Sequence, residues 1–514
     1  MMRLRGRYYA WVPFWPATLR AKVLLVGGCG AVGLGVWIAQ AALWSSDRNP
    51  ARWVLWTGSP VVRGPVGLVA ELAMLTWLLP IPPMLMGFLG YLLLGSPAPA
   101  LELRSIPQRV CFRIVSRGQN RDVLRETVEN LLEVMGVLPL FSYAVEVVTD
   151  LAVAWPAPRH VHFLCVPAGY RTRSGARHKA RALQYALEVS PVAPSDWLVH
   201  LDEETQLTPS AVVGIAQAID EEERSQEHRI GQGAILYHRR FGLGFKALLL
   251  SMADMVRTGD DLGRFHLQHQ LGLPLFGLHG SYIVVRNSVE REVGFDLGPE
   301  GSVTEDAFWA LAQLGRGRRT RWVHGYMVEQ PPARIRDFLR QRRRWLWGLL
   351  LVLRHAPAPW WTKLGMGVCV FSWALSWVGL LTVYGDLVVG QLAWWPVRLS
   401  GDVCVALYAA CYVIGLRENL HYVGVSRWKR WPLYLVELAC LPVFALLEGA
   451  AVVYGLATRG GGMGFHVISK PATRRGTHER KESVTAPGRR PGWDGSLVGH
   501  ARPAGPPPPA TGRS

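Results

Sequence analysis

Long apolar runs lie near both ends of the sequence, and shorter apolar runs lie between them. Residues 21–43 contain one basic residue, Lys22, and no acidic residue. This run is long enough to cross the roughly 30 Å hydrocarbon core of a bilayer as a helix. Residues 66–94 predict a second span, which three prolines within it must kink. The pattern therefore predicts a membrane region with two spans over residues 1–103.

The C-terminal part of the chain has a similar pattern. Apolar runs return at residues 364–392, 402–416 and 433–457. We expect residues 346–458 to form an interfacial helix followed by these membrane spans. Residues 459–514 are basic and rich in Pro and Gly. Such a composition cannot bury a core, so this tail is expected to be mostly disordered.

Residues 104–345 have the pattern of an α/β domain. Apolar runs of strand length alternate with charged segments, and residues 119–136 place Leu124, Val128, Leu131 and Leu132 on one helical face. Strands that alternate with helices predict a mostly parallel sheet, inserted here between transmembrane helices. The strands are expected at residues 110–118, 143–150, 160–167 and 196–202.

Composition supports the membrane assignment. Half of the residues are hydrophobic, and 22 are Trp. A net charge of +18 can indicate a nucleic-acid partner. The aromatic excess and the long apolar runs instead indicate that Lys and Arg orient the chain across a bilayer, so we expect no nucleic-acid partner. The seven cysteines form no CxxC pair, and neither disulfides nor a zinc site are expected.

Charge also predicts orientation. Four arginines precede the first span and place the N-terminus in the cytoplasm. Two spans then return the α/β domain to the cytoplasm, as part of a multi-pass membrane protein. Three further spans would leave the basic tail outside, against the positive-inside tendency. Either one C-terminal segment is a hairpin or interfacial, or the pattern hides another span.

Three predicted strands end in polar groups suited to binding or catalysis. In an open parallel sheet, ligands bind beyond the carboxyl ends of the strands. Asp150 ends one strand, Asp202 and Glu204 follow another, and Arg117 follows a third. Both carboxylates of the Asp202 turn can reach one Mg²⁺ or Mn²⁺ ion, which would bridge them to a diphosphate. On its own, however, such an acidic turn is more often simply solvated.

Thr304, Glu305 and Asp306 precede a helical pattern about a hundred residues later. Acidic residues in a first helical turn are favoured by the helix dipole, so this stretch alone does not indicate a site.

The stretch RQRRRWLWGLLL, residues 340–351, lies where the chain turns apolar. Arg344 offers bidentate donors suited to an anion, and Trp345 offers an aromatic face. Arg340, Arg342 and Arg343 are expected along the bilayer surface, against anionic headgroups.

Two other segments carry weaker signals. A Gly-flanked turn before a strand could bind a glycan hydroxyl, or it could be only a turn; it contains His279, Gly280 and Ser281. A second segment has charged residues at helical spacing and is expected to be a solvated face; it contains Asp254, Arg257, Asp260 and Asp261.

Four motifs occur in order between the predicted spans: Asp150, Asp202-x-Glu204, Thr304-Glu305-Asp306 and Gln341-x-x-Arg344-Trp345. They resemble the D, DxD, TED and QxxRW motifs of membrane-embedded family-2 glycosyltransferases. Residues 104–350 further resemble the egghead type of β-1,4-mannosyltransferase, over VPAGYRTRSGARHKARALQYALE, DWLVHLDEET, GSYIVVR and EQPPARIRDFLRQRRRWLWG. The resemblance implies a nucleotide-sugar-binding fold of the GT-A type.

The resemblance also implies roles. Asp150 would contact the nucleotide base, Asp202 and Glu204 would hold the divalent metal, and Asp306 would be the general base. Glu204 stands where most of the wider family has Asp, which leaves the geometry of the metal open. The diphosphate and the acceptor would be positioned by Lys179, Gln341, Arg344 and Trp345, with Arg117 near the donor. Candidate acceptor-binding residues are His279, Gly280, Ser281 and Glu305.

We therefore predict an inverting glycosyltransferase with a nucleotide-sugar donor, favoured as GDP-mannose by the resemblance, and a membrane lipid or glycolipid acceptor joined in a β-1,4 linkage. A processive polysaccharide synthase is an alternative, although it would need more spans for an export channel. A non-catalytic transporter or receptor that binds nucleotide is a second alternative. That alternative predicts that the acidic motifs are scattered in space.

Overall fold

A seven-stranded sheet forms the centre of the α/β domain in the computed structural model, which describes residues 2–4, 7–9, 18–45, 65–95, 105–153, 155–241, 244–389 and 395–458. Its strand order is β5-β4-β3-β6-β8-β7-β9. All neighbouring strands are parallel except for the two pairs made by β8. The strands are β3 (Arg109–Ser116), β4 (Ser142–Thr149), β5 (Val161–Cys165), β6 (Trp197–Asp202), β7 (Ile230–Leu236), β8 (Ile283–Arg286) and β9 (Thr320–Val328). The expected α/β class with a mostly parallel sheet is confirmed.

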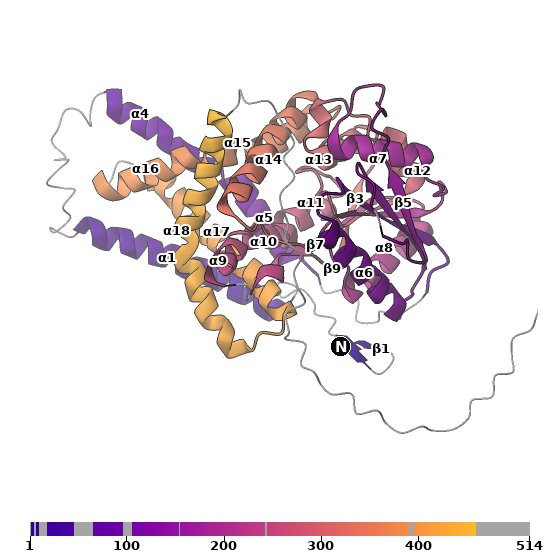
Figure 1. Cartoon of the computed structure of the whole chain (residues 1–514). Helices are drawn as coiled ribbons and strands as arrows, with labels where there is room; N and C mark the ends of the chain where they lie inside the picture. The colour runs from indigo at the N-terminus through magenta and orange to yellow at the C-terminus, as the bar shows by residue number, and fades with distance from the viewer. Residues whose placement is uncertain are drawn as a thin grey trace, which may run out of the picture. The chain divides into compact units, whose positions relative to one another are not determined.

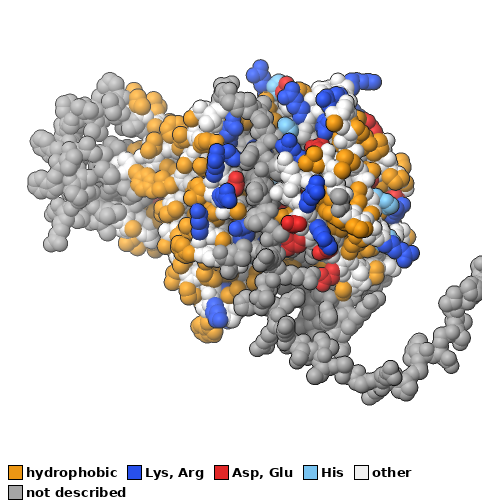
Figure 2. All heavy atoms as spheres, in the orientation of Figure 1, with side chains coloured by type: hydrophobic (Ala, Val, Ile, Leu, Met, Phe, Trp, Pro, Cys, Tyr) orange, Lys and Arg blue, Asp and Glu red, His pale blue; other side chains and the backbone are white. Residues whose placement is uncertain are grey.

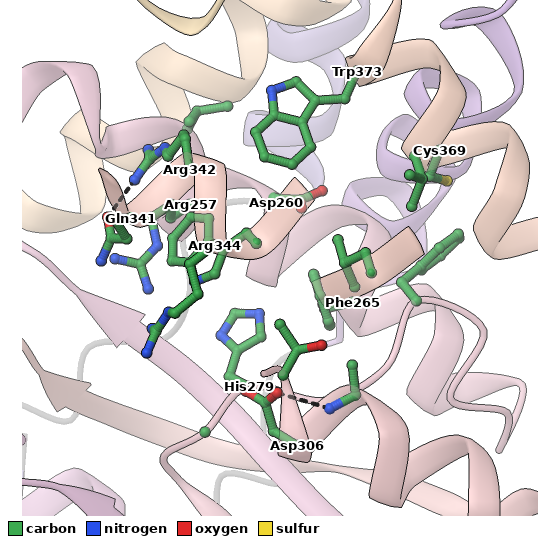
Figure 3. A pocket seen from close by; sticks show the side chains of 18 of the residues that line it. Arg257, Asp260, Phe265, His279, Asp306, Gln341, Arg342, Arg344, Cys369 and Trp373 are labelled. Atoms are coloured by element: carbon green, nitrogen blue, oxygen red, sulfur yellow. Dashed lines mark hydrogen bonds between the residues drawn. The ribbon is translucent and has the colours of Figure 1, made fainter. Parts of the chain in front are cut away.

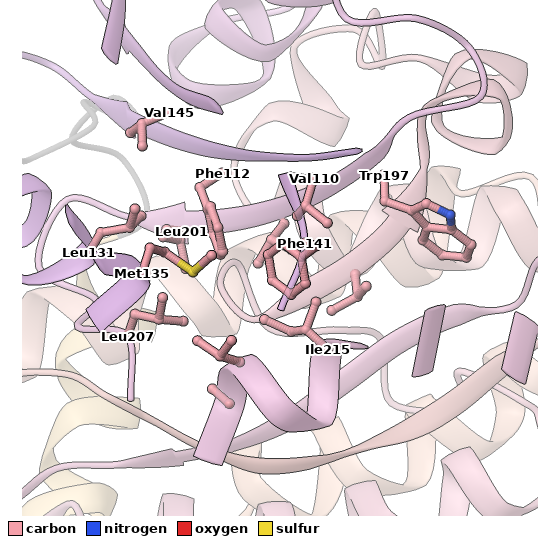
Figure 4. Close-up of a cluster of buried hydrophobic side chains, with 14 of the residues drawn as sticks. Val110, Phe112, Leu131, Met135, Phe141, Val145, Trp197, Leu201, Leu207 and Ile215 are labelled. Carbon is pink, nitrogen blue, oxygen red and sulfur yellow. The ribbon is translucent and has the colours of Figure 1, made fainter. Parts of the chain in front are cut away.

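Helices cover both faces of this sheet. One face packs on α6 (Arg121–Val137) and α8 (Pro209–Ser225), with the side chains of Phe112, Leu131 and Ile215 in the shared core (Figure 4). The other face packs on α7 (His178–Val189), α12 (Asn287–Val293) and α13 (Glu305–Gly315). Because both faces are covered, the strands read as continuous apolar runs in the sequence.

Buried charges interrupt that apolar core. Arg113 lies on β3 with no exposed surface and pairs with Glu146 at 2.7 Å and with Glu290 at 2.8 Å. Glu290 also pairs with His200 of β6. Each buried charge therefore has a partner of opposite sign, as the cost of burial requires.

Apolar helices lie beside the α/β domain (Figure 1). Within the residues that the structure describes, four segments are long and apolar enough to cross a membrane, and a pair of helices bent by 47° would add a fifth. On the face shown in Figure 2, hydrophobic side chains gather over these helices, and charged ones gather over the α/β domain and its junction with them. The membrane-region elements are α1 (Leu19–Ser45), α4 (Pro65–Met74), η2 (Leu75–Leu78), α5 (Ile81–Leu93), α14 (Ile335–His355), α15 (Trp360–Ala374), α16 (Ser376–Val389), α17 (Trp395–Tyr422) and α18 (Arg427–Ala457).

The helices differ in detail from the sequence pattern. The apolar run at 364–392 is divided between α15 and α16, which form the bent pair. The expected domain boundary at residue 345 falls inside α14, because this helix runs from the α/β domain into the membrane region without a break. Leu132 of α6 is half-buried, whereas Leu124, Val128 and Leu131 are buried as expected. The predicted tail, residues 459–514, lies outside the described residues.

A short helical segment joins the α/β domain to the membrane helices. It consists of α10 (Met255–Asp260) and the π-helix η4 (Asp261–Phe265), and it follows η3 (His238–Arg240) and α9 (Phe245–Ala253) and precedes α11 (His266–Gln270). A Cβ atom on Gly90 of α5 would lie 1.8 Å from the Gly263 carbonyl oxygen, and one on Gly259 would lie 2.1 Å from the Cys411 carbonyl oxygen of α17. Glycine at these positions lets the α10–η4 segment pack directly against both helices.

Candidate active site

A cavity of about 1310 Å³ opens at the carboxyl ends of β3, β4 and β6 and continues among the membrane helices (Figure 3). It brings together residues from all four motifs, which are far apart in the sequence, and from three further segments. Twelve of the thirteen residues predicted for the site line it: Arg117, Asp150, Lys179, Asp202, Glu204, His279, Gly280, Glu305, Asp306, Gln341, Arg344 and Trp345. The acidic motifs therefore converge on one cavity. The non-catalytic transporter or receptor alternative predicts the opposite, motifs that are scattered in space.

The Asp202 turn meets α7 and the Gly280 turn at one point. Lys179 of α7 lies 2.5 Å from Asp202 Oδ1 and donates a hydrogen bond of 2.8 Å to the Gly280 carbonyl oxygen. A Cβ atom on Gly280 would lie 2.9 Å from Lys179 Nζ, 3.3 Å from Asp306 Oδ2 and 3.5 Å from Asp202 Oδ2. A side chain at this position would crowd Lys179 Nζ, so glycine lets these three charged side chains meet close to the backbone.

Lys179 stays charged in this position. Burial alone would lower its pKa, but Asp202 and then Glu305 outweigh burial and raise the pKa of Lys179 above its usual value. Glu305 Oε1 lies 3.5 Å from the ammonium group. A fixed positive charge beside Asp202 suits the binding of phosphate oxygens.

Asp306 lies in the first turn of α13, where its Oδ1 atom accepts a hydrogen bond of 2.8 Å from the Ala307 backbone N–H. Burial, and then the like charge of Glu305, raise the pKa of Asp306 to about 7, against the opposing effect of Lys179. A carboxylate with a pKa near the working pH is suited to accept a proton. The other oxygen, Oδ2, faces the space beside Gly280.

Arginines from three elements gather on the donor side of the cavity. Burial, and then the positive charges of Arg177, Arg117 and Arg344, lower the pKa of His178. These guanidinium groups come from the end of β3, the start of α7 and the middle of α14, and all line the cavity. Asp150, at the end of β4, pairs with Arg181 of α7. This side of the cavity therefore carries the positive charge that a diphosphate needs.

Glu329 is a site residue that the sequence analysis missed. It follows β9, whose carboxyl end lies at the same edge of the sheet as that of β6. Its carboxylate accepts hydrogen bonds from Thr205 Oγ1, at 3.0 Å, and from Ser281 Oγ. Burial, and then Glu204 and Asp202, raise the pKa of Glu329 to about 7. The rule that found Asp202 would also have found Glu329 if residues 320–328 had been recognised as a strand.

The carboxylates of this turn fit a divalent cation. Asp202, Glu204 and Glu329 concentrate negative charge at the cavity wall, since Glu204 and Asp202 lie close enough to Glu329 to raise its pKa. Within the described part of the chain, no group of three His, Cys, Asp or Glu residues is arranged to hold a metal by itself. Mg²⁺ commonly binds to one or two carboxylates together with substrate phosphates, so two protein ligands match this chemistry.

The two side chains of the Gly280 turn face different surroundings. His279 lines the cavity, with its Nε2 atom 3.2 Å from Asp261 Oδ1 and its ring centroid 4.3 Å from that of Phe265. Ser281 is the one predicted site residue that does not line the cavity. It is buried, and its hydroxyl group donates to Glu329, so it is placed to hold Glu329 rather than to contact an acceptor.

The expectation that Arg342 lies at the bilayer surface is wrong. Arg342 is buried, and it pairs with Asp254 at 2.7 Å and with Glu448 of α18 at 3.1 Å. Its guanidinium carbon lies 4.6 Å from the ring centroid of Trp345, which Arg257 approaches to 5.0 Å from another element. Two arginines thus lie close to the ring of the motif tryptophan.

The expectation of a solvated face over residues 254–261 is also wrong. Asp254 and Asp261 are buried, because Arg342 pairs with Asp254 and the Ile235 backbone N–H donates to Asp261 at 3.0 Å. Arg257 lies 3.9 Å from Glu329 and over the ring of Tyr237. The charges of this segment point into the protein and toward the cavity.

Comparison with known proteins places the chain in a family. A sequence model of the glycosyl transferase family group 2 matches residues 197–414. The chain is 34% identical over 403 residues to beta-1,4-mannosyltransferase egh of Drosophila melanogaster, and the matched region covers 76% of this chain and 85% of that protein. It is 32% identical over 402 residues to beta-1,4-mannosyltransferase bre-3 of Caenorhabditis elegans, and this match covers 77% of this chain and 86% of that protein.

A solved structure is also similar, the mannosyltransferase PcManGT from Pyrobaculum calidifontis in complex with GDP-Man and Mn²⁺. The TM-score is 0.42 and the identity 13%, over 76% of this chain and 98% of that one. A likeness of this degree carries no conclusion about ligands. The sequence identity to the two relatives, however, shows the family to which the chain belongs. The chain is a family-2 glycosyltransferase and belongs to the family of the egghead-type β-1,4-mannosyltransferases.

Proposed function

We propose that this enzyme transfers one mannose from GDP-mannose to a membrane lipid or glycolipid, with inversion and in a β-1,4 linkage. The observation that carries the proposal is the meeting of Lys179, Asp202 and Asp306 beside Gly280 in the wall of one cavity. The mannose and the linkage are supported by the names of the two relatives. GDP as the nucleotide is supported by the family resemblance.

The donor lies at the carboxyl edge of the sheet in this proposal. Asp150 contacts the base, while Lys179 and Arg344 bind diphosphate oxygens. Asp202 and Glu204 would hold a Mg²⁺ or Mn²⁺ ion, which when bound supplies positive charge that stabilises the leaving diphosphate. Glu329 holds the Asp202 turn through Thr205, whose hydroxyl oxygen accepts a hydrogen bond of 3.2 Å from the Asp202 backbone N–H.

The reaction is a single displacement at the anomeric carbon. Asp306 accepts the proton of the acceptor hydroxyl group as its oxygen forms a bond to that carbon. The bond between the anomeric carbon and the β-phosphate oxygen breaks, and the nucleoside diphosphate leaves with the electron pair. Attack from the face opposite to the leaving group inverts the anomeric configuration, which converts an α-linked donor into a β-linked product.

The membrane-side half of the cavity supports a lipid acceptor. Its walls come from η2, α5, α15, α16 and α17, and they include Trp77, Met84, Trp373 and Leu380. At about 1310 Å³, the cavity exceeds the roughly 300–1,000 Å³ of sites that hold one drug-sized ligand. The volume and the apolar walls suit a second substrate that carries hydrocarbon.

We further propose a topology that keeps the catalytic domain and both termini in the cytoplasm. The bent pair α15–α16 would be a re-entrant element, so that four spans remain. An even number of spans returns the basic tail to the side of the N-terminal arginines, as the positive-inside tendency requires. Cysteine accessibility at positions 10 and 480 in sealed vesicles tests this: labelling of both from the same side is expected, and labelling from opposite sides would exclude four spans.

Purified protein in detergent or nanodiscs, incubated with a panel of nucleotide sugars, Mn²⁺ and a membrane lipid extract, tests the proposed reaction. We expect acceptor-dependent release of GDP from GDP-mannose above all other donors. Acceptor-dependent release from UDP-sugars alone would exclude the proposed donor. Long sugar polymers in the product would favour the processive alternative.

A further inference from the structure

One ion pair lies in the membrane-side half of the cavity and has no part in the reaction described above. Asp260 and Arg264 are one helical turn apart on the α10–η4 segment, and Arg264 Nε lies 2.9 Å from Asp260 Oδ1. A second contact, from Arg264 Nη2 to Asp260 Oδ2, makes the pair bidentate. Both side chains line the cavity, and 29% of Asp260 and 20% of Arg264 remain exposed. In the view of Figure 3, Asp260 lies between Trp373 on one side and the two residues His279 and Asp306 on the other.

Membrane helices surround this pair. The Asp260 carboxylate lies within electrostatic reach of Tyr91 on α5 and Cys411 on α17, and Arg264 contacts the thiol of Cys369 on α15. The guanidinium carbon of Arg264 lies 4.5 Å from the ring centroid of Phe276. Bringing two charges into such apolar surroundings is expensive, and replacement of a buried ion pair by apolar groups is often neutral or stabilising. Stability therefore does not account for this pair.

The pair also lies close to the reacting groups. His279 lines the same cavity, and its imidazole ring is within electrostatic range of both Asp202 and Arg264. Most of the other residues that line the membrane-side half are apolar. Consider an acceptor whose hydrocarbon lies among the membrane helices and whose reactive hydroxyl group lies at Asp306. The part of that molecule between the hydrocarbon and the hydroxyl group must then lie next to Asp260 and Arg264.

The charge of the pair restricts what it can recognise. Asp260 and Arg264 neutralise each other, so the pair offers strong hydrogen-bond acceptors and donors without net charge. Vicinal hydroxyl groups of a sugar can bridge such a carboxylate and guanidinium, and the nearby ring of Phe276 gives an apolar face. A lipid phosphate would instead bring its own negative charge close to the Asp260 carboxylate, which would repel it.

We propose that Asp260 and Arg264 form a hydroxyl-binding subsite for the sugar headgroup of the acceptor. The subsite fixes the headgroup so that one hydroxyl group reaches Asp306, while the hydrocarbon part lies among α5, α15, α16 and α17. This inference rests on the proposed transfer to a membrane acceptor. It assigns the recognition of that acceptor to two residues outside the motifs of the family.

The test measures transfer to butyl, octyl and dodecyl β-glucosides with the variants Asp260→Asn and Arg264→Gln. We expect the KM for these acceptors to rise about 10- to 100-fold, because each variant loses charge-assisted hydrogen bonds. The dissociation constant of GDP-mannose, measured by calorimetry, should change by less than about threefold, since the donor binds at the other end of the cavity. The chain offers a matched control in Asp220→Asn and Arg224→Gln, an ion pair of the same spacing on the exposed surface of α8.

Deoxy analogues of octyl glucoside, assayed with the wild-type protein, provide a test that does not depend on the folding of a variant. Removal of a bridging hydroxyl group should raise the KM of the wild-type protein, and the same removal should have little further effect in Asp260→Asn. An unchanged acceptor KM in both variants would overturn the subsite while leaving the proposed reaction standing. Failure of the wild-type protein to glycosylate any acceptor would overturn the proposed reaction, and the subsite with it. Preferred transfer to a lipid phosphate over alkyl glucosides would also overturn the subsite.

Discussion

The two halves of the cavity are built from different chemistry. At the sheet edge, unlike charges crowd together: Asp202, Glu204, Glu329 and Asp306 lie near Lys179 and several arginines, and the pKa values of Asp306 and Glu329 are raised to about 7. On the membrane side, most wall residues are apolar, and Asp260 and Arg264 form a neutral pair. The first half can change protonation and bind a charged donor, and the second can select and orient. A separation of this kind suits the proposed transfer from a water-soluble donor to a lipid.

We expect the largest effect from removing the proposed general base, Asp306, in the sheet-edge half of the cavity. Asp306→Asn keeps the shape of the side chain and removes its basicity, so turnover should fall by about 10² to 10⁴. Donor affinity should change by less than about tenfold. Turnover is measured by mass spectrometry of the lipid product, and donor affinity by calorimetry.

Asp337→Asn is the matched control for this variant. It changes the first-turn aspartate of α14, which is buried and does not line the cavity. If Asp306→Asn retained transfer, Asp306 would not be the base. If it lost donor binding as well, its role would be to hold the start of α13.

The second prediction concerns the charge that the donor needs. Asp202→Asn should weaken Mn²⁺-dependent nucleotide binding by at least about tenfold, because even partners of metal ligands cost this much when changed. Excess EDTA should stop transfer by the wild-type protein, and added Mn²⁺ or Mg²⁺ should restore it. Calorimetry with and without Mn²⁺ gives the affinity, and full activity in EDTA would refute a metal at the Asp202 turn.

The third prediction separates hydrogen bonding from charge at Glu329. Glu329→Gln keeps an oxygen that can accept from Thr205 and Ser281, whereas Glu329→Ala removes it. If Glu329 positions the Asp202 turn, Glu329→Ala should weaken donor binding about tenfold, and Glu329→Gln should lose less. Equal losses in the two variants, measured as the KM for GDP-mannose, would assign the effect to charge alone.

The smallest expected effect is a shift in pH dependence. Asp306 must be ionised to accept a proton, and its pKa is raised to about 7, so turnover should fall as the pH drops through this value. Glu305→Gln removes the like charge that contributes to this rise, and the acid limb should move to lower pH. An acid limb that stayed in place would show that Glu305 does not act on Asp306.

Much of this architecture could be predicted from local pattern. Continuous apolar runs marked the buried strands, and polar residues at their ends pointed to Asp150 and Asp202. The environment of Arg342 could not be predicted, because its partners Asp254 and Glu448 are 88 and 106 residues away in the chain. The same holds for Asp261, whose partner is a backbone N–H group of β7. From local sequence, a charged residue is predicted to be exposed, because the partner that allows its burial can lie far away in the chain.

In the proposed reaction, one cavity brings a GDP-mannose donor and a single hydroxyl group of a membrane acceptor together. To test this reaction, the wild-type protein is incubated with GDP-mannose, Mn²⁺ and an alkyl glucoside, and the product is analysed by mass spectrometry and NMR. We expect the addition of one hexose in a β-1,4 linkage. An α linkage, or release of GDP without any glycosylated acceptor, would contradict it.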